Sequence, residues 1–256
     1  MRRNGFTLFE LLVVIAILGL LATLVLGSVR AAFHSASLAV SSNNIRSLMV
    51  GSVAYLGDHD SRFWRFRENK LGEGGVYWWF GYEPQESLRA GEGERWFDPD
   101  KGPLGGYVSA GLVPDPSFSR TGKAFKPKYR FGYIGLGYNV LLADSAGHAG
   151  RGWAGSGTPA RLQQLPNPEE VVVFATSAQV NTFQSPATPS NPMIEEFYGI
   201  DDREVTVHFR HNGQAMVVFA NGSTGLLDMD PSTLDTRAPD AMIGRFAGVG
   251  STRYLR

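Results

Sequence analysis

The sequence predicts an α+β fold, in which a long N-terminal helix packs on a loop-rich, mainly antiparallel β domain. Three observations predict it. An uninterrupted apolar run opens the chain, a stretch poor in Gly and Pro extends the helical pattern, and alternating strands with tight-turn dipeptides lie near the C-terminus. The 31 Gly and 14 Pro among 256 residues indicate many turns in the second part.

The composition excludes several classes of protein. With 43% hydrophobic and 19% charged residues, the chain is too apolar for disorder and too polar for several membrane spans. The 24 basic residues balance the 24 acidic ones, so the chain lacks the excess of positive charge that is typical of proteins that bind nucleic acid. The chain contains no cysteine, which excludes disulfides, thiolate zinc sites, iron–sulfur clusters and cysteine nucleophiles.

The apolar run predicts a membrane-spanning helix over residues 6–29. It contains one charged residue, Glu10, and at about 1.5 Å per residue it is long enough for a hydrocarbon core of about 30 Å. Arg2 and Arg3 precede it and favour a cytoplasmic N-terminus, which would leave the rest of the chain outside.

We expect Glu10 to have a partner, because placing an unpaired carboxylate inside a membrane costs free energy. A cut between Gly5 and Phe6 would create a new amine on Phe6, four residues from Glu10. The same amine of a neighbouring subunit could then neutralise the carboxylate within the bilayer. An ordinary secretory signal would instead be cut after the apolar run, near Gly27-Ser28, and a plain signal-anchor helix is a further alternative.

The residues around this site resemble the N-terminal signature of type IV prepilins and type II secretion pseudopilins. They read Gly5-Phe6-Thr7-Leu8-Phe9-Glu10-Leu11-Leu12-Val13-Val14-Ile15. The resemblance implies that prepilin peptidase cuts after the leader 1–5, that Phe6 is N-methylated, and that Glu10 guides assembly by meeting the N-terminus of an adjacent subunit.

The same resemblance implies a pilin-like fold and a structural subunit without enzymatic activity. Its implied partners are copies of itself, other pilins or pseudopilins, prepilin peptidase, an inner-membrane assembly platform and the lipid bilayer, with no nucleic acid. Its implied location is the bacterial inner membrane, crossed once, with a cytoplasmic N-terminus and a periplasmic globular domain, before it enters a filament.

Residues 30–57 predict an amphipathic continuation of the helix. Leu38, Ile45, Leu48, Ser52 and Tyr55 recur at helical spacing, and polar residues lie between them: Ser41, Ser42, Asn43, Asn44 and Arg46. We expect the stripe to pack on the protein's own domain rather than on a partner. Gly57-Asp58 is the expected end of the helix, and residues 58–256 form the expected globular domain.

An aromatic segment follows the helix. It contains Trp64, Tyr77, Trp78, Trp79, Phe80, Tyr82, Trp96 and Phe97. The favoured interpretation is a small core under loop-rich structure, and the alternative is a surface that binds sugars or a partner, with Trp78 and Trp79 essential.

The C-terminal part gives the clearest β pattern. A buried strand is expected at 170–174, and Val205, Val207 and Phe209 alternate along a strand at 204–209. Asn212-Gly213 predicts a tight turn into a second strand at 214–219, and Asn221-Gly222 predicts a type I′ turn into a third at 223–227. Together these segments predict a three-stranded antiparallel meander.

The meander also resembles the His-x9-Asp-Gly signature of a pseudopilin-like family. His211 and Gly222 fit its spacing, but Asn221 replaces the Asp. The stretch 168–177 resembles a second family segment, with Thr176 where an Asp usually stands, and Asp58 with Phe63 fits an Asp-then-aromatic pattern. The two missing carboxylates argue against a shared metal or acid–base role.

No catalytic residue is predicted, since neither a nucleophile elbow nor a phosphate-binding loop is present. The candidate metal ligands are His208, His211, Asp228 and Asp230, although two histidines three residues apart start on opposite faces of a strand. No cofactor is expected. Calcium remains an alternative, because it is known in some major pseudopilins of type II secretion, but those positions do not map onto this chain. A membrane-anchored glycan- or partner-binding module and a tethered hydrolase are the rival functions.

Overall fold

The computed structural model describes residues 7–69, 72, 74–108, 115, 118, 125–130, 135–143, 157–247 and 254–255. The predicted cleavage site at Gly5 and Phe6 lies outside these residues, as does most of the Gly- and Ala-rich stretch at 143–158.

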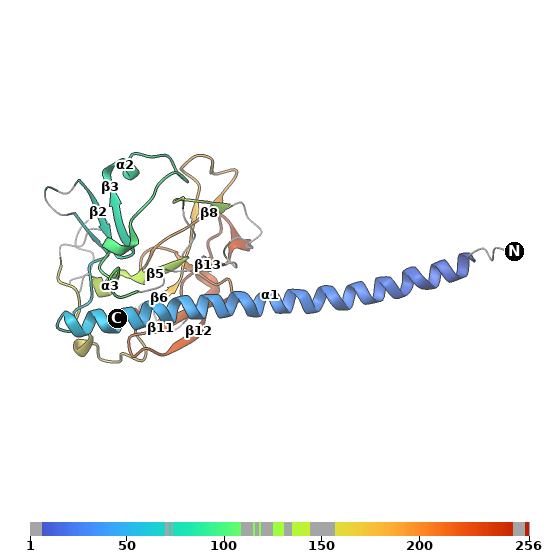
Figure 1. The fold of residues 1–256 in the computed structure, drawn as a ribbon, viewed down its shortest axis with the longest axis horizontal. Helices are drawn as coiled ribbons and strands as arrows, with labels where there is room; N and C mark the ends of the chain where they lie inside the picture. Colours follow the sequence, from blue (N-terminus) through green and yellow to red (C-terminus); the bar gives the residue numbers. More distant parts are fainter. Residues whose placement is uncertain are drawn as a thin grey trace.

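One helix, α1 (Leu8–Asp58, 51 residues), dominates the shape of the molecule. Its first half projects away from the rest of the chain, and its second half lies along the globular part (Figure 1). Among the described residues, α1 is the helix that is long and apolar enough to cross a membrane. The predicted single long helix is confirmed, and it ends at the predicted Asp58.

Within the described residues the strands form four small sheets, and most neighbours run antiparallel. The central sheet has the order β12-β11-β6-β5-β9, and the others are β1-β2-β3, β4-β8-β7 and β10-β13. Only the β5–β9 and β4–β8 pairs among these ladders are parallel. The strands are β1 (Arg67–Glu68), β2 (Gly75–Trp78), β3 (Gly81–Pro84), β4 (Phe125–Lys126), β5 (Leu136–Asn139), β6 (Val172–Thr176), β7 (Gln179–Asn181), β8 (Met193–Glu195), β9 (Gly199–Ile200), β10 (Val207–His208), β11 (Gln214–Phe219), β12 (Thr224–Asp228) and β13 (Ile243–Gly244).

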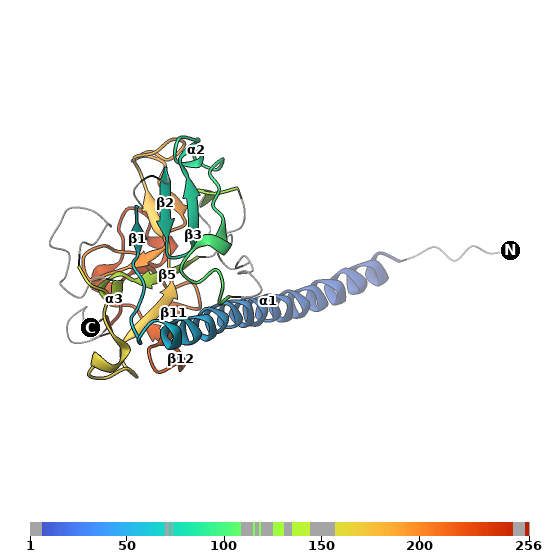
Figure 2. The same cartoon turned by 60° about the vertical axis from the view of Figure 1, so that its left-hand side comes forward.

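Short helical turns connect these strands. They are α2 (Gln85–Leu88), η1 (Pro99–Lys101), α3 (Val140–Ala143), η3 (Leu162–Gln164), η4 (Pro231–Thr233) and η5 (Pro239–Ala241). The β1-β2-β3 sheet stands beside the central sheet (Figure 2). The result is the predicted α+β fold, a long apolar helix followed by mainly antiparallel β structure.

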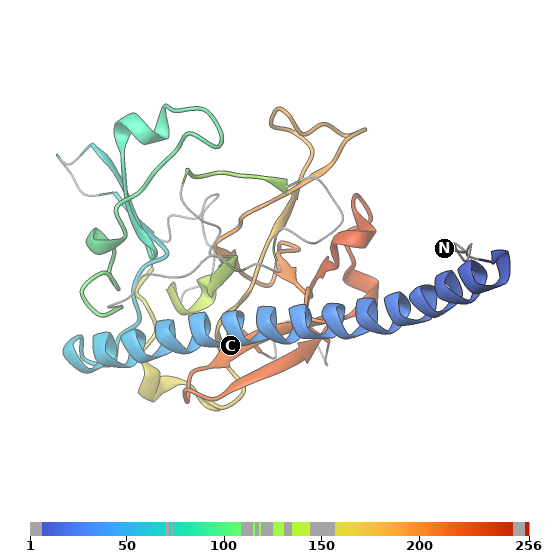
Figure 3. The same cartoon turned by 45° about the vertical axis from the view of Figure 1, so that its right-hand side comes forward.

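The central sheet lies between two apolar layers. Along β11, Met216 and Val218 belong to the cluster that includes the second half of α1, while Ala215 and Val217 belong to the cluster on the other face. The helix crosses this sheet over β11 and β6 (Figure 3). Because both faces are covered, β6 is buried along its whole length, as the sequence predicted for a strand in this region.

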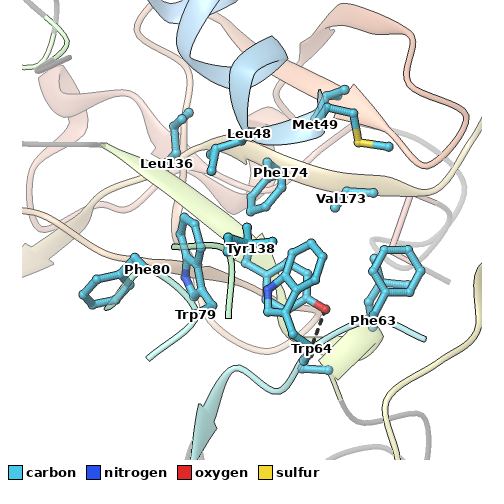
Figure 4. Packing of buried hydrophobic residues seen from close by; sticks show 14 of the residues in the cluster. Leu48, Met49, Phe63, Trp64, Trp79, Phe80, Leu136, Tyr138, Val173 and Phe174 are labelled. Carbon is cyan, nitrogen blue, oxygen red and sulfur yellow. Dashed lines mark hydrogen bonds between the residues drawn. The ribbon is translucent and has the colours of Figure 1, made fainter. Parts of the chain in front are cut away.

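The aromatic segment fills the core between α1 and the β domain. Trp64 and Trp79 are only 2% and 1% exposed, and both stack around Tyr138 and Phe174 (Figure 4). The Trp79 indole N–H donates to the Tyr198 carbonyl at 2.6 Å, so its polar atom is also satisfied inside. The core interpretation is confirmed for these residues, and Trp79 is not placed to stack on a sugar.

The predicted three-stranded meander is wrong in one strand. β11 and β12 form the expected hairpin, but β10 pairs with β13, and the second edge of β11 pairs with β6. The Asn212-Gly213 turn has the positive φ angles of a type I′ turn, +54° and +83°. The dipeptide therefore predicted the turn before β11 correctly but not the pairing of the strands on either side of it, because β10 pairs with β13, a segment distant in sequence.

The predicted turn at Asn221-Gly222 into the next strand is present, but its predicted type I′ geometry is wrong. Gly222 has a φ of +87°, but Asn221 is not among the residues with positive φ. The Gly222 N–H donates to the Phe219 carbonyl and the Phe219 N–H to the Ser223 carbonyl, at 2.9 and 2.8 Å. This is a three-residue loop that ends in a left-handed glycine.

The polar face predicted for the second half of α1 needs a correction. Ile45 and Leu48 are buried as expected, but Ser41 and Asn44 are buried as well. Meanwhile Val50 and Val53 are exposed. The buried stripe is therefore polar toward the membrane end and apolar toward the far end, and the next section gives the physical reason.

Candidate functional site

The start of α1 places Glu10 in a capping box. The Thr7 N–H and hydroxyl donate to Glu10 Oε2 at 2.9 and 2.8 Å, and the Glu10 N–H donates to Thr7 Oγ1 at 3.2 Å. The carboxylate is thus turned back toward the N-terminal end of the helix. Sequence analysis missed this role of Thr7, although a Thr with Glu three residues later is its signature.

The first half of α1 presents large apolar side chains outward on all sides. The exposed ones are Leu8, Phe9, Leu11, Leu12, Val13, Val14, Ile15, Ile17, Leu18, Leu20, Leu21, Leu24, Val25, Leu26 and Val29. A helix that is apolar all round is stable only in lipid or among other apolar helices. This half of α1 therefore requires a membrane or neighbouring subunits to cover it.

The second half of α1 meets the β domain first through a polar seam, which we define as Ser37, Ser41 and Asn44 of α1 with Asp115, His208, Arg210 and His211. Ser41 donates to Asp115 Oδ2, and Arg210 donates to the same oxygen through Nη2 at 2.7 Å. The side chains of Arg210 and Asp115 are 2% and 1% exposed. This buried, hydrogen-bonded ion pair is the reason why polar residues occupy the inner face of the helix here.

Two histidines of the seam are buried and neutral. Arg210 Nη1 lies 3.3 Å from His208 Nδ1, and burial together with this guanidinium holds the pKa of His208 well below its usual range. The His211 ring lies against His34 of α1, with centroids 6.4 Å apart. Burial and the nearby Arg210 lower the pKa of His211 to about 4.

The candidate metal ligands are engaged in different places. Asp228 Oδ1 accepts from Gln214 Nε2 at 2.9 Å, and Asp230 Oδ1 accepts the Ser232 N–H at 2.9 Å at the start of η4. Across the described residues, no group of three or more His, Asp or Glu is arranged to hold a metal ion. The geometry therefore gives no support to a site built from His208, His211, Asp228 and Asp230, or to a calcium site.

The family-motif residues have structural roles in this chain. Asn221 Oδ1 accepts from the Ser223 N–H and hydroxyl at 2.9 and 2.7 Å, so it closes the turn around Gly222. Thr176 Oγ1 donates to the His208 carbonyl at 2.8 Å and accepts the Met216 N–H at 3.2 Å. Thr176 thereby joins β6 to β10 and β11, at a position where the resembled family carries Asp.

Two adjacent glutamates, Glu195 and Glu196, are buried and have different partners. Lys126 Nζ pairs with Glu195 Oε2 at 2.7 Å. Glu196 Oε2 accepts the Lys128 N–H at 2.9 Å, and burial raises the pKa of Glu196 to about 7. No sequence signal marked Glu196, because its hydrogen-bond partner Lys128 lies 68 residues away in the chain.

Comparison with known proteins adds one finding at the N-terminus. Residues 1–26 match the family model of the prokaryotic N-terminal methylation motif. No match was found among curated proteins or among solved structures. This motif supports a type IV prepilin- or pseudopilin-like protein, as the N-terminal residues indicated.

The motif points to a structural subunit that assembles with other pilin-type subunits. Together with the apolar half of α1, it fits a protein anchored in the membrane by a single span.

Proposed function

We propose that the protein is a structural subunit of a type IV pilus-like or type II secretion pseudopilus filament. In this proposal prepilin peptidase cleaves between Gly5 and Phe6, Phe6 is N-methylated, and the subunit assembles through its N-terminal helix. The observation that carries the proposal is the methylation motif at residues 1–26, on a helix whose first half is apolar on every side.

The proposal divides the chain into four parts. Residues 1–5 are the leader, 6–29 the membrane-spanning part of the helix, 30–57 its amphipathic continuation and 58–256 the globular domain. The N-terminus lies in the cytoplasm and the globular domain in the periplasm, and the inner membrane holds the subunit until an assembly platform extracts it. No step requires an enzymatic activity of the subunit.

Glu10 has two partners in succession in this mechanism. In the isolated chain its carboxylate accepts hydrogen bonds from Thr7. Within a filament, the amine of Phe6 on an adjacent subunit would meet the same carboxylate, which already faces the start of the helix. A charge-assisted bond in apolar surroundings is stronger than a bond to a neutral donor.

The test separates capping from assembly. Glu10→Gln keeps an acceptor at the third helical position but removes the charge, and Thr7→Val removes the hydroxyl but keeps the carboxylate. In native cells we expect Glu10→Gln to be processed normally, to accumulate in the membrane and to be lost from sheared filaments. Thr7→Val should still assemble. Filaments containing Glu10→Gln at the wild-type level would contradict the proposed role of the charge.

A further inference from the structure

A groove of about 590 Å³ lies beside the last turns of α1, at the end of the domain far from the apolar half of the helix. The last helical turns, the segment after α1, strand β2 and the residues after η1 surround it. Its volume falls in the range of about 300–1,000 Å³ that is typical of ligand pockets. Tyr55, which lines it, lies about 39 Å beyond Val29 at a rise of about 1.5 Å per residue.

Basic side chains outnumber acidic ones in the groove. Arg62, Arg65 and Lys101 line it, with Glu68 as the acidic residue of the lining. Residues 58–256 as a whole carry twenty basic and twenty-three acidic residues, so this positive charge is local. A groove with a local excess of positive charge attracts anions.

These cations can reach a ligand. The Lys101 side chain is 61% exposed, and its pair with Asp98 at 3.3 Å is a surface pair of little energetic worth. Arg62 Nη1 donates to the Pro159 carbonyl at 3.3 Å, which holds the guanidinium at the wall of the groove. Arg65 is exposed.

Aromatic rings form the other part of the wall. Tyr77 and Trp78 of β2 both belong to the lining of the groove and are half-buried. Because they are successive residues of a strand, their side chains project to opposite faces of the sheet. The Trp78 indole N–H donates to Glu83 Oε2 at 2.9 Å, and the Tyr77 ring packs on Tyr82 with centroids 4.6 Å apart. Both rings are thus held before any ligand binds, which reduces the entropy lost on binding.

We infer that this groove binds an acidic saccharide. The carboxylate or sulfate meets Arg62, Arg65 and Lys101, and the apolar face of the sugar ring lies against Tyr77. The inference is independent of filament assembly, because it uses none of the N-terminal residues. It does not use Trp79, which the sugar-binding alternative of the sequence analysis required, because Trp79 belongs to the core.

The test measures binding of defined probes to the full chain in detergent by isothermal titration calorimetry. The probes are a galacturonate hexasaccharide, a heparin hexasaccharide, uncharged maltohexaose and a short oligothymidylate. The variants are Arg65→Glu with Lys101→Glu, and separately Tyr77→Ala. Arg89→Glu is the matched control, because Arg89 is also exposed and does not line the groove.

We expect one or both acidic hexasaccharides to bind, and maltohexaose to bind at least about tenfold more weakly, a difference of about 1.4 kcal/mol. Double charge reversal and Tyr77→Ala should each weaken binding by at least about tenfold, with circular dichroism unchanged, and Arg89→Glu should bind as the wild type does. The inference is overturned if neither acidic probe binds, if the groove variants bind like the wild type, or if oligothymidylate binds more tightly than both acidic saccharides.

Discussion

The imidazole rings of His34 and His211 lie edge to face, with their centroids 6.4 Å apart. This contact joins α1 to the turn that leads into β11, close to where the helix leaves its apolar half. Neither ring nitrogen of His211 has a hydrogen-bond partner among the described residues. A proton on His211 would therefore be buried beside Arg210, with Asp115 as the opposing charge.

The first prediction concerns acid stability. His211 has a pKa of about 4 in the folded protein and 6.5 as its ordinary value, so only the unfolded chain takes up this proton between these pH values. Stability is then fully present above pH 6.5 and falls as the pH drops toward 4, by about 3 kcal/mol for a shift of this size. His211→Phe should flatten this slope in urea titrations of the full chain in detergent, with a residual slope from His208. An unchanged slope would contradict the burial of a neutral His211.

The second prediction concerns Glu196, whose ionisation gives the stability of the fold the opposite dependence on pH. Its pKa of about 7 lies above the ordinary 4.5, so the folded protein holds a proton that the unfolded chain releases. Stability should fall as the pH rises from 4.5 to 7 and then stay level. Glu196→Gln removes the ionisation and should stabilise the protein at pH 7.5 by up to about 3 kcal/mol. The same variant should differ little from the wild type at pH 4.5, and a pH-independent effect would show that packing rather than charge is responsible.

The Arg210–Asp115 pair predicts strong coupling between the helix and the β domain. Asp115→Ala leaves a guanidinium buried without its carboxylate, which costs about 3–5 kcal/mol. Replacing both partners, with Arg210→Met, should recover most of this loss. The exposed Arg130–Glu94 pair is the control, and its removal should cost less than about 1 kcal/mol. Equal losses for the single and double variants would refute the coupling.

Two glycines of α1 should respond to alanine in opposite directions. A Cβ atom at Gly51 would lie 2.6 Å from Val108 Cγ2 and 3.0 Å from the Tyr107 carbonyl oxygen, so Gly51→Ala should cost about 1–3 kcal/mol. A Cβ atom at Gly57 meets no described atom within 4 Å, and Gly57→Ala should stabilise the helix by about 0.5 kcal/mol. Thermal unfolding of both variants checks this, and a stabilising Gly51→Ala would mean that helix propensity outweighs the close approach.

The sequence predicted the features that depend on local patterns. The apolar run predicted α1, and Asn212-Gly213 predicted the turn before β11, because each signal is contained in one continuous segment. The predictions that failed concern contacts between residues that lie far apart in the sequence. β10 pairs with β13 across some 35 residues, with His208 opposite Ile243. Ser41 is buried because Asp115, 74 residues away, accepts its hydrogen bond.

The candidate site divides in the same way. Glu10 could be identified from the sequence because a single charged residue within an apolar run is a local sequence pattern. Arg210 could not be identified in this way, because charged residues are common near strand ends. Its role depends on a buried carboxylate from another segment of the chain, Asp115. The groove beside Tyr77 was also hidden, since its wall brings together residues from four separate stretches of the chain.

The central claim is that the chain is processed as a prepilin, and the N-terminal mass of the protein from its native membranes tests it most directly. We predict a mature chain that begins at Phe6 with a methylated amine. A chain that still begins at Met1, or one that begins near Ser28, would contradict prepilin processing and the assembly mechanism that depends on it.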